Sequence, residues 1–161
     1  VAVVHGGGQE GGLRPGTENV AGIVGAAVAI AEAQTGWKER SESVIAVRDQ
    51  AISHIQSELP QALLNGVTGA DRVANNINIS MPGLDTEFAA VVLDKHGFAV
   101  STKSACSGAG GGASTVVLET TVDPARAQST LRITLGPDTN LDQIKALTQI
   151  LQTHVEQMSQ Y

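Results

Sequence analysis

The chain has 161 residues, of which 42% are hydrophobic and 2% aromatic, and its 10 basic and 16 acidic residues give a net charge of -6. This length and apolar content suffice for one domain, or one domain with a remnant of another, and an acidic chain without a basic cluster argues against nucleic acid or an anionic membrane as partner. Because we find no membrane span or signal peptide and a lone cysteine cannot form an internal disulfide, we expect a cytoplasmic protein.

The first 36 residues predict a strand end, a glycine-rich turn and a helix. Residues 1–4 (VAVV) look like the end of a buried strand, and the six glycines and one proline of residues 5–16 exclude regular structure. Thr17 stands where a helix N-cap is expected. Apolar residues then recur at helical spacing on one face, namely Val20, Ile23, Val24, Ala27, Val28 and Ala31.

Residues 37–97 predict two helices with a strand between them. Residues 37–59 have a second helical pattern, which Gly36 separates from the first and Pro60 ends, and the sequence leaves open whether the two form one bent helix. After a turn-rich connection, residues 76–80 (NINIS) alternate polar and apolar, as a half-buried strand does. Asp85 can cap a short helix that carries Leu84, Phe88, Val91 and Val92 and ends before Gly97.

Two further strands are expected toward the end of the chain. Residues 98–103 (FAVSTK) predict a strand that leads directly to Cys106. Residues 130–136 (TLRITLG) predict another, with Leu131, Ile133 and Leu135 on one face. Arg132 and Thr134 then point to the opposite face.

The sequence closes with a predicted amphipathic helix. Thr139 and Asp142 have the spacing of a capping box, and the helix they would start carries an apolar stripe of Leu141, Ile144, Leu147, Leu151, Val155 and Met158. Together with the earlier elements, this order of strands and helices indicates an α/β or α+β domain.

Three residues suggest a functional site, and each also has an ordinary structural explanation. Cys106, the only cysteine, is followed at residues 107–115 by Gly, Ala, Ser and Thr alone, which favours a mobile thiol over a packed one, although it could equally be incidental. Arg132 is either a solvated strand residue or a bidentate clamp for a carboxylate. Thr17 is either a plain cap or, beside a helix N-terminus, part of a phosphate site.

Other familiar sites are excluded by missing parts. The HGGG at residues 5–8 resembles an esterase oxyanion loop, but the nucleophile elbow of that fold is absent. No glycine is followed by lysine, which excludes a nucleotide phosphate loop. The four histidines, His5, His54, His96 and His154, are scattered without metal spacing, and none is selected as the partner of a cysteine-protease thiol.

Taken together, three segments resemble the cysteine desulfurases, pyridoxal-phosphate enzymes of the class V aminotransferase family. HGGGQEGGLRPGTENVAGIVG (residues 5–25) is similar to their glycine-rich turn and helix, VSTKSACSGAGG (residues 100–111) to their active-site loop, and STLRITLG (residues 129–136) to the strand that supplies their substrate-binding arginine. The segments come in the family's order, cover nearly the whole chain, and have the extended loop of its long-loop group.

The resemblance implies a role for each matching residue. Cys106 corresponds to the nucleophile that takes sulfur from L-cysteine as a persulfide, and through that persulfide it would also contact an iron–sulfur cluster under assembly. Arg132 corresponds to the clamp for the substrate carboxylate. Thr17 corresponds to the residue that binds the pyridoxal 5'-phosphate phosphate group of the neighbouring subunit in a homodimer, and His5 helps to build the turn that presents it. A sulfur-acceptor or iron–sulfur scaffold protein is the implied partner.

The chain also departs from the family pattern. Gly11 replaces an arginine that many members have, and the Schiff-base lysine lies in a family segment upstream of the HGGG turn that this sequence does not contain. The four lysines, Lys38, Lys95, Lys103 and Lys145, are not in that context. The resemblance therefore implies a remnant of the large domain at residues 1–36 and a C-terminal small domain with a long connecting helix at residues 37–161, which we expect to be inactive alone.

Two alternatives stay open at this point. Another class V enzyme, such as a selenocysteine lyase or an aminotransferase, would share the turn and the arginine, but an aminotransferase would not need Cys106. Alternatively, the chain is a non-catalytic fragment that only binds a partner.

Overall fold

The computed structural model describes residues 1–102 and 112–158, and it divides the chain into two compact units, Val1–Trp37 and Lys38–Tyr161. The first unit contains a 3-10 helix at Gln9–Gly12 and helix α1 at Val20–Gln34. Residues 1–4 form no strand, contrary to the prediction, because a strand needs a hydrogen-bonded neighbour and none lies beside them in the described part of the chain.

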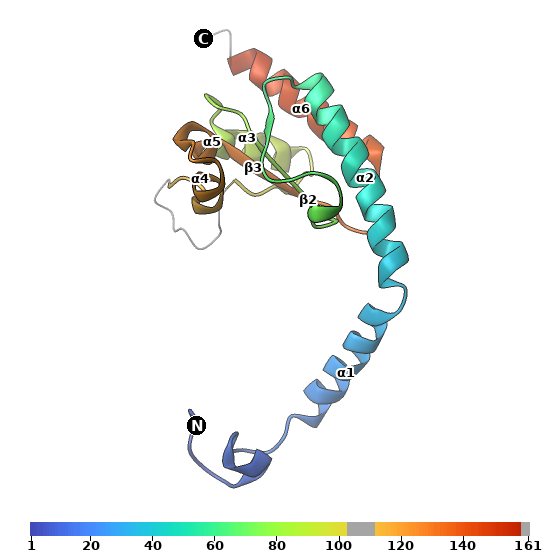
Figure 1. The fold of residues 1–161 in the computed structure, drawn as a ribbon, viewed down its shortest axis with the longest axis vertical. Helices are drawn as coiled ribbons and strands as arrows, with labels where there is room; N and C mark the ends of the chain where they lie inside the picture. Colours follow the sequence, from blue (N-terminus) through green and yellow to red (C-terminus); the bar gives the residue numbers. More distant parts are fainter. Residues whose placement is uncertain (103–111, 159–161) are drawn as a thin grey trace. The chain divides into compact units, whose positions relative to one another are not determined.

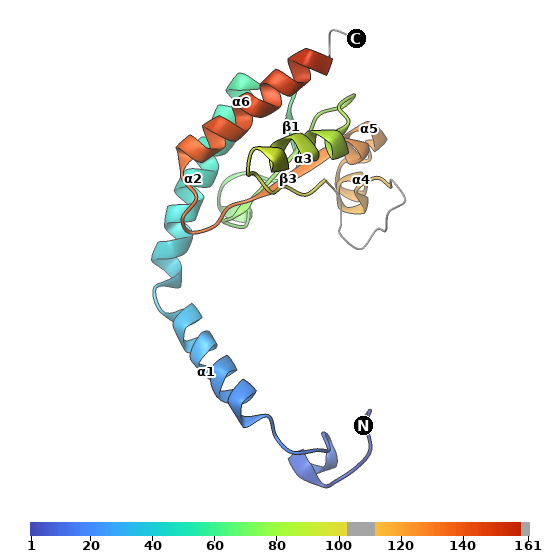
Figure 2. The same ribbon diagram turned by 180° about the vertical axis from the view of Figure 1, so that it is seen from behind.

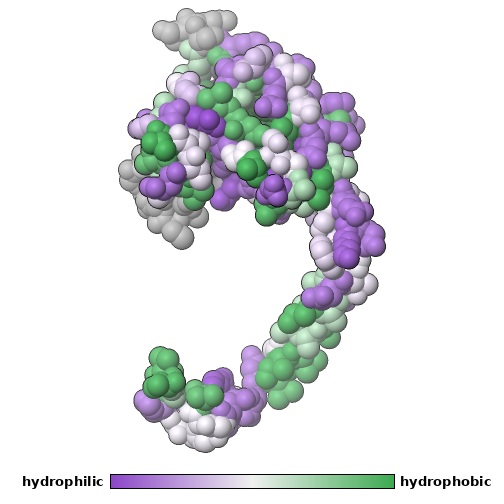
Figure 3. All heavy atoms as spheres, viewed as in Figure 1, coloured by the Kyte–Doolittle hydropathy of each residue, from purple (hydrophilic) through white to green (hydrophobic). Residues whose placement is uncertain are grey.

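Helix α1 is capped by Asn19 and not by Thr17 as predicted. The Asn19 Oδ1 atom accepts a hydrogen bond from the Gly22 backbone N–H at 3.0 Å, and asparagine caps helices at least as well as threonine. The apolar residues of α1 are all exposed, and Figure 3 shows them as hydrophobic spheres along the helix. The helix ends before Gly36, whose φ of 64° is left-handed, so the two helical patterns are separate helices.

The second unit is built on a three-stranded antiparallel sheet in the order β1-β2-β3 (Figures 1 and 2). Strand β1 is Leu63–Leu64, β2 is Asn76–Ser80 and β3 is Thr130–Thr134. The strands predicted at 76–80 and 130–136 are therefore present, the second ending two residues early. Of the strand predicted at 98–103, the described residues 98–102 form one bridge, between Ser101 and Arg132, because among them only Ser101 reaches the ladder of β3.

Three helices cover one face of the sheet with apolar side chains. They are α2 at Trp37–Glu58, α3 at Thr86–Lys95 and α6 at Leu141–Met158 (Figure 2). Alternation in β2 and β3 turns four residues toward these helices, and the core forms where they meet: Ile77, Ile79, Leu131, Ile133, Ile52, Ile55, Leu93, Ile144, Leu147 and Leu151. The predicted mixed helix-and-sheet class of the small domain is confirmed.

The predicted N-cap is correct for helix α3 and wrong for helix α6. The Asp85 carboxylate accepts from the N–H groups of Glu87 and Phe88, as expected, although α3 buries Ala89 and Leu93 rather than Phe88. At α6 the capping box is Asn140 with Gln143, which exchange two 3.0 Å hydrogen bonds, and not Thr139 with Asp142. The Thr139 hydroxyl instead accepts from the Gly136 N–H, which commits it to the preceding turn.

Two short helices that the sequence did not reveal, α4 at Thr115–Thr121 and α5 at Pro124–Gln128, cover one end of the other sheet face. Their Val117 and Ala127 are buried. Ser80 of β2 and Thr130 of β3 both donate hydroxyl hydrogen bonds to the Arg126 carbonyl, at 2.8 and 2.9 Å. The rest of this face carries polar side chains.

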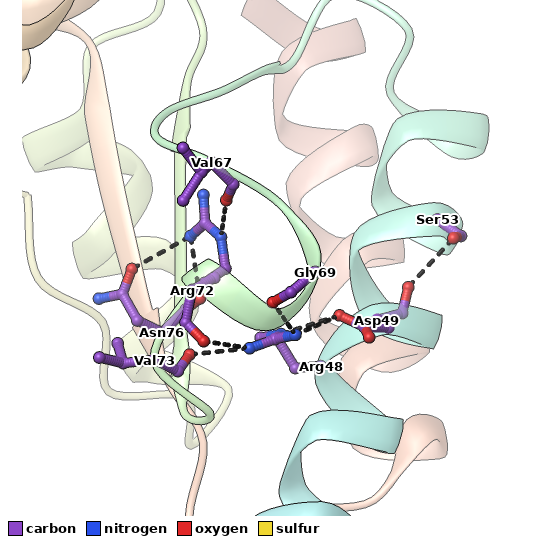
Figure 4. Close-up of polar contacts among 8 residues, drawn as sticks. All are labelled: Arg48, Asp49, Ser53, Val67, Gly69, Arg72, Val73 and Asn76. Atoms are coloured by element: carbon purple, nitrogen blue, oxygen red, sulfur yellow. Dashed lines mark hydrogen bonds and ion pairs between the residues drawn. The ribbon is translucent and has the colours of Figure 1, made fainter.

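A pair of buried arginines holds the connection between β1 and β2 (Figure 4). Arg48 of α2 is 0% exposed and donates to the carbonyls of Gly69, Arg72 and Val73, while its charge pairs with Asp49 at 2.8 Å. Arg72 in turn donates to the carbonyls of Val67, Asn76 and Asn65. Burial, and next the positive charge of Arg48, lower the pKa of Arg72. An irregular connection is thus fixed by side chains from outside it.

Replacing Arg48 by methionine is expected to lower the free energy of unfolding by about 3 kcal/mol, because buried carbonyls lose their donors. Arg40→Met, on the exposed part of the same helix, is the matched control and should cost less than about 0.5 kcal/mol. Urea unfolding followed by circular dichroism measures both. Equal effects of the two substitutions would show that the Arg48 hydrogen bonds do not stabilise the fold.

No single helix in the described ranges is both long and apolar enough to cross a membrane, although the pair α1 and α2 meets the criteria of length and composition when taken together.

Candidate functional site

The open part of the polar sheet face is hollowed into a cavity of about 410 Å³. Asn76 and Asn78 of β2 and Thr130 and Arg132 of β3 line it, and all four alternate away from the apolar core. Residues of the connection that the buried arginines hold, including Val67 and Arg72, form another wall. The cavity is therefore built on strands and on a hydrogen-bonded connection.

Arg132 brings a positive charge into this cavity. Its backbone is fixed on both sides, because it pairs with Asn78 of β2 and exchanges two hydrogen bonds, at 2.6 and 3.0 Å, with Ser101. Its side chain is exposed, and within residues 1–102 and 112–158 its guanidinium has neither a hydrogen bond nor an ion pair. A fixed backbone with an unpaired planar cation is suited to binding a carboxylate or phosphate in two parallel hydrogen bonds.

Asn65 connects the cavity to the elements around it. Its side-chain oxygen accepts two hydrogen bonds from Arg126, at 2.6 and 3.1 Å. Its side-chain nitrogen donates to the Asn78 Oδ1 atom and to the Ser80 hydroxyl, both at 2.7 Å. Its backbone carbonyl accepts from Arg72. One asparagine, 5% exposed, thereby joins β1, β2, α5 and the arginine-held connection.

The predicted nucleophile, Cys106, lies outside the described residues. Described residues on both sides of its segment line the cavity, however. Thr102 precedes the segment and Ser114 follows it, and Ser114 is held as the N-cap of α4 by donating its backbone N–H to the Ala127 carbonyl. Thr102, the last described residue before the segment, and Ser114, the third described residue after it, thus both line the cavity that contains Arg132.

His5 and Thr17 belong to the first unit, where both are exposed. The turn between them closes where Gly6 meets Pro15, because a Cβ atom on Gly6 would lie 2.8 Å from the Pro15 Cβ. Arg14 donates to the carbonyls of Gly16 and Thr17, both at 2.8 Å. The Thr17 hydroxyl has no partner among the described residues and stands two residues before the N-cap of α1.

The sequence predicted Arg132 as a binding residue but did not reveal the hydrogen-bond network of Asn65, Asn78 and Arg126 beside it. Asn65 and Arg126 gave no signal, because their partners are 61 residues apart in the chain. Arg48 did give a signal in the sequence. It lies four residues after Val44 and four before Ile52, which places it within the apolar stripe of the helix, where a buried residue is expected. No group of His, Cys, Asp and Glu side chains that could hold a metal occurs in the described part of the chain.

Comparison with known proteins identifies the family. The family model for class-V aminotransferases matches residues 6–147. The chain belongs to this family. Among curated class-V relatives, "Cysteine desulfurase IscS" of Clostridium botulinum is 35% identical over 156 residues, which is 96% of this chain and 39% of that protein. An "IscS-like cysteine desulfurase" of Mycobacterium tuberculosis is 35% identical over 136 residues, which is 84% of this chain and 35% of that protein.

The fold of this class-V aminotransferase segment also matches a solved structure. A NifS-like protein superposes with a TM-score of 0.77 at 27% identity, covering 96% of this chain and 39% of that one. The predicted resemblance to cysteine desulfurases and the predicted fold class are thus confirmed. The chain spans about 39% of the length of the first of these relatives.

Proposed function

We propose that this chain is the C-terminal part of a cysteine desulfurase, which converts L-cysteine to L-alanine and retains the sulfur as a persulfide on Cys106. The observation that carries the proposal is the cavity of Arg132. The Arg132 guanidinium, which has no partner among the described residues, lies in a cavity that is also lined by Thr102 and Ser114, on either side of the cysteine segment. Relatives named cysteine desulfurase over 84% or more of this chain support the same activity.

In this proposal Arg132 binds the substrate carboxylate. The guanidinium is planar and permanently charged, and two parallel N–H donors match the two oxygens of a carboxylate. Leu131 and Ile133 on the other face of β3 pack in the hydrophobic core, so the cation is presented from a strand that the core holds in place. The amino acid is therefore oriented by its α-carboxylate, with its side chain free to point toward the nucleophile.

The sulfur transfer balances without an external oxidant. The Cys106 thiolate attacks the substrate sulfur, an S–S bond forms, and the Cβ–S bond of L-cysteine breaks with its electron pair left on carbon. After proton uptake at that carbon the products are L-alanine and the Cys106 persulfide. Cys106 is oxidised and the substrate carbon reduced, so a later thiol acceptor must remove the sulfur.

Residues of the first unit fit one part of the implied cofactor, pyridoxal 5'-phosphate. The Thr17 hydroxyl is exposed and without a described partner, and it stands just ahead of the N-terminus of the 15-residue helix α1, where anions are favoured. Thr17 would hold the phosphate of a neighbouring subunit, and His5 with the closed turn would present it. When bound, the cofactor supplies the electron sink for breaking the Cβ–S bond.

The implied surroundings belong to the same proposal. We place the complete enzyme in the cytoplasm as a homodimer that passes sulfur to an acceptor or iron–sulfur scaffold protein, with the persulfide as the contact to the growing cluster. The net charge of -6 supports a protein partner over a nucleic acid.

The proposal is tested by incubating the complete protein that carries this chain with L-cysteine and measuring the mass of the peptide that contains Cys106. We expect a gain of one sulfur atom together with one L-alanine per sulfur. A transaminase would produce a 2-oxo acid and leave the peptide unmodified, and a selenocysteine lyase would release selenium from selenocysteine but little sulfur from cysteine. A protein with none of these products would be a binding module.

The segment by itself is expected to produce no alanine from L-cysteine, even with added pyridoxal phosphate. Its lysines lie outside the family's Schiff-base motif, so the cofactor has no covalent anchor here. Amino-acid analysis of the reaction mixture measures this, with the complete protein as the positive control. Alanine production by the 161-residue segment would contradict the proposal that none of its four lysines anchors the cofactor.

A further inference from the structure

Asn78 is the nearest polar neighbour of Arg132 across the sheet. The two residues are directly paired between β2 and β3, and both alternate to the face that lines the cavity. Side chains opposite one another in an antiparallel pair have Cβ atoms about 4.5–5.5 Å apart. The Asn78 amide and the Arg132 side chain therefore start from neighbouring points on the cavity wall, and the orientation of that amide decides whether it attracts or repels an anion.

The hydrogen-bond network fixes this orientation step by step. Arg126 has only donors, so the Asn65 oxygen must face it, which leaves the Asn65 nitrogen facing Asn78 and Ser80. Ser80 confirms the assignment, because its single hydroxyl proton goes to the Arg126 carbonyl at 2.8 Å and its oxygen is left to accept from Asn65. The Asn78 oxygen is consequently the acceptor at 2.7 Å from the Asn65 nitrogen.

The remaining group of Asn78 is its side-chain NH₂. This NH₂ has no hydrogen-bond partner in the described residues. It is not buried either, because the single buried side-chain atom without a partner in those residues is His154 Nε2. The NH₂ is therefore open to the cavity. At the same time the Asn78 oxygen accepts from Asn65, and no hydrogen bond joins it to the Arg132 guanidinium, which has no partner among the described residues.

We propose that Asn78 is a second substrate-binding residue, which donates a hydrogen bond to the carboxylate held by Arg132, and that Asn65 is a positioning residue that keeps its donor turned toward the carboxylate. This inference rests on the proposed function for the identity of the carboxylate. Under this inference both Arg132 and Asn78 recognise the carboxylate by which an amino acid differs from a simple amine.

The test measures ligand binding in the complete holoenzyme through the change in cofactor absorption. The probes are L-alanine, which has the carboxylate, and ethylamine, which is the same molecule without it. Asn78→Ala should raise the Kd of L-alanine about tenfold, since a hydrogen bond to a charged group is lost, and leave the Kd of ethylamine unchanged. Thr134→Ala is the control, because Thr134 lies on the same sheet face but does not line the cavity, and it should change neither Kd.

Asn65→Asp tests the positioning role. An aspartate still accepts from Arg126 but cannot donate, so Asn78 would turn its NH₂ toward residue 65 and its oxygen toward Arg132. We expect weaker L-alanine binding in this variant, and in its background Asn78→Ala should cause no further loss. Such non-additivity is expected if Asn65 affects ligand binding through Asn78.

The outcomes separate the two proposals. An unchanged L-alanine Kd in Asn78→Ala, or an equal loss for ethylamine, overturns the role of Asn78 whether or not Asn65→Asp folds. Additive effects of the two substitutions overturn the positioning role of Asn65. A wild-type enzyme that binds L-alanine through Asn78 but forms no persulfide from L-cysteine would leave this inference standing and refute the desulfurase.

Discussion

Replacement of Cys106 by alanine is expected to lower persulfide formation and L-alanine production from L-cysteine by about 10³-fold or more in the complete enzyme. The thiolate is the attacking atom, and no neighbouring side chain can substitute for it because the chain has a single cysteine. The rate of sulfide release with a reducing thiol measures the loss, and the mass of the Cys106 peptide shows whether sulfur is still attached.

Binding provides the control for this variant. Alanine at position 106 removes the nucleophile and leaves the cavity of Arg132 and Asn78 unaltered, so the Kd of L-alanine should stay within about twofold of the wild type, below the 1.4 kcal/mol that a tenfold change represents. A Cys106→Ala enzyme that keeps its alanine production would exclude the desulfurase and favour a transaminase, which has no use for a thiol.

Replacement of Arg132 by alanine is the second large effect that we expect. The loss of a charge-assisted pair with the substrate carboxylate should reduce kcat/KM for L-cysteine by about 10²-fold or more, because truncating one partner of such a pair costs about 2–5 kcal/mol. Arg132→Lys keeps the charge but not the two parallel donors, and it should fall between the alanine variant and the wild type.

Thr134→Ala is the matched control on the same strand. Thr134 shares the exposed face of β3 with Arg132 but does not line the cavity, so its replacement should leave kcat/KM within about twofold. Steady-state kinetics on the complete enzyme measures all three variants. Equal losses for Arg132→Ala and Thr134→Ala would mean that the strand is being damaged and that Arg132 binds no substrate.

Much of the second unit could be predicted from the sequence because its signals are local. Period-two alternation gave β2 and β3 with the correct faces, and the side of the sheet on which Arg132 lies follows directly from it. The apolar stripe gave α6, although its cap was misplaced, because Thr139 and Asn140 are adjacent candidates and only the turn at Gly136 decides between them.

Several of the remaining errors have a common physical origin in partners that are distant along the chain. Residues 98–103 have strand character, but pairing depends on the hydrogen-bonding groups that β3 leaves open, and the described residues 98–102 form one bridge. The network of Asn65, Arg126 and Asn78 depends on contacts across 61 and 13 residues, which no window of the sequence contains. Helix α1 carries the expected apolar face, yet what its side chains contact cannot be derived from their spacing.

The division of β3 into two faces also restricts how this protein can change. Leu131 and Ile133 fill the core while Arg132 faces the cavity, so an insertion or deletion of one residue within Thr130–Thr134 would turn the cation into the core and two aliphatic chains into water. Such a change would remove folding and ligand recognition in one step. Variation in what the site accepts must therefore arise by substitution in β3, while changes of length are confined to the connections at its ends.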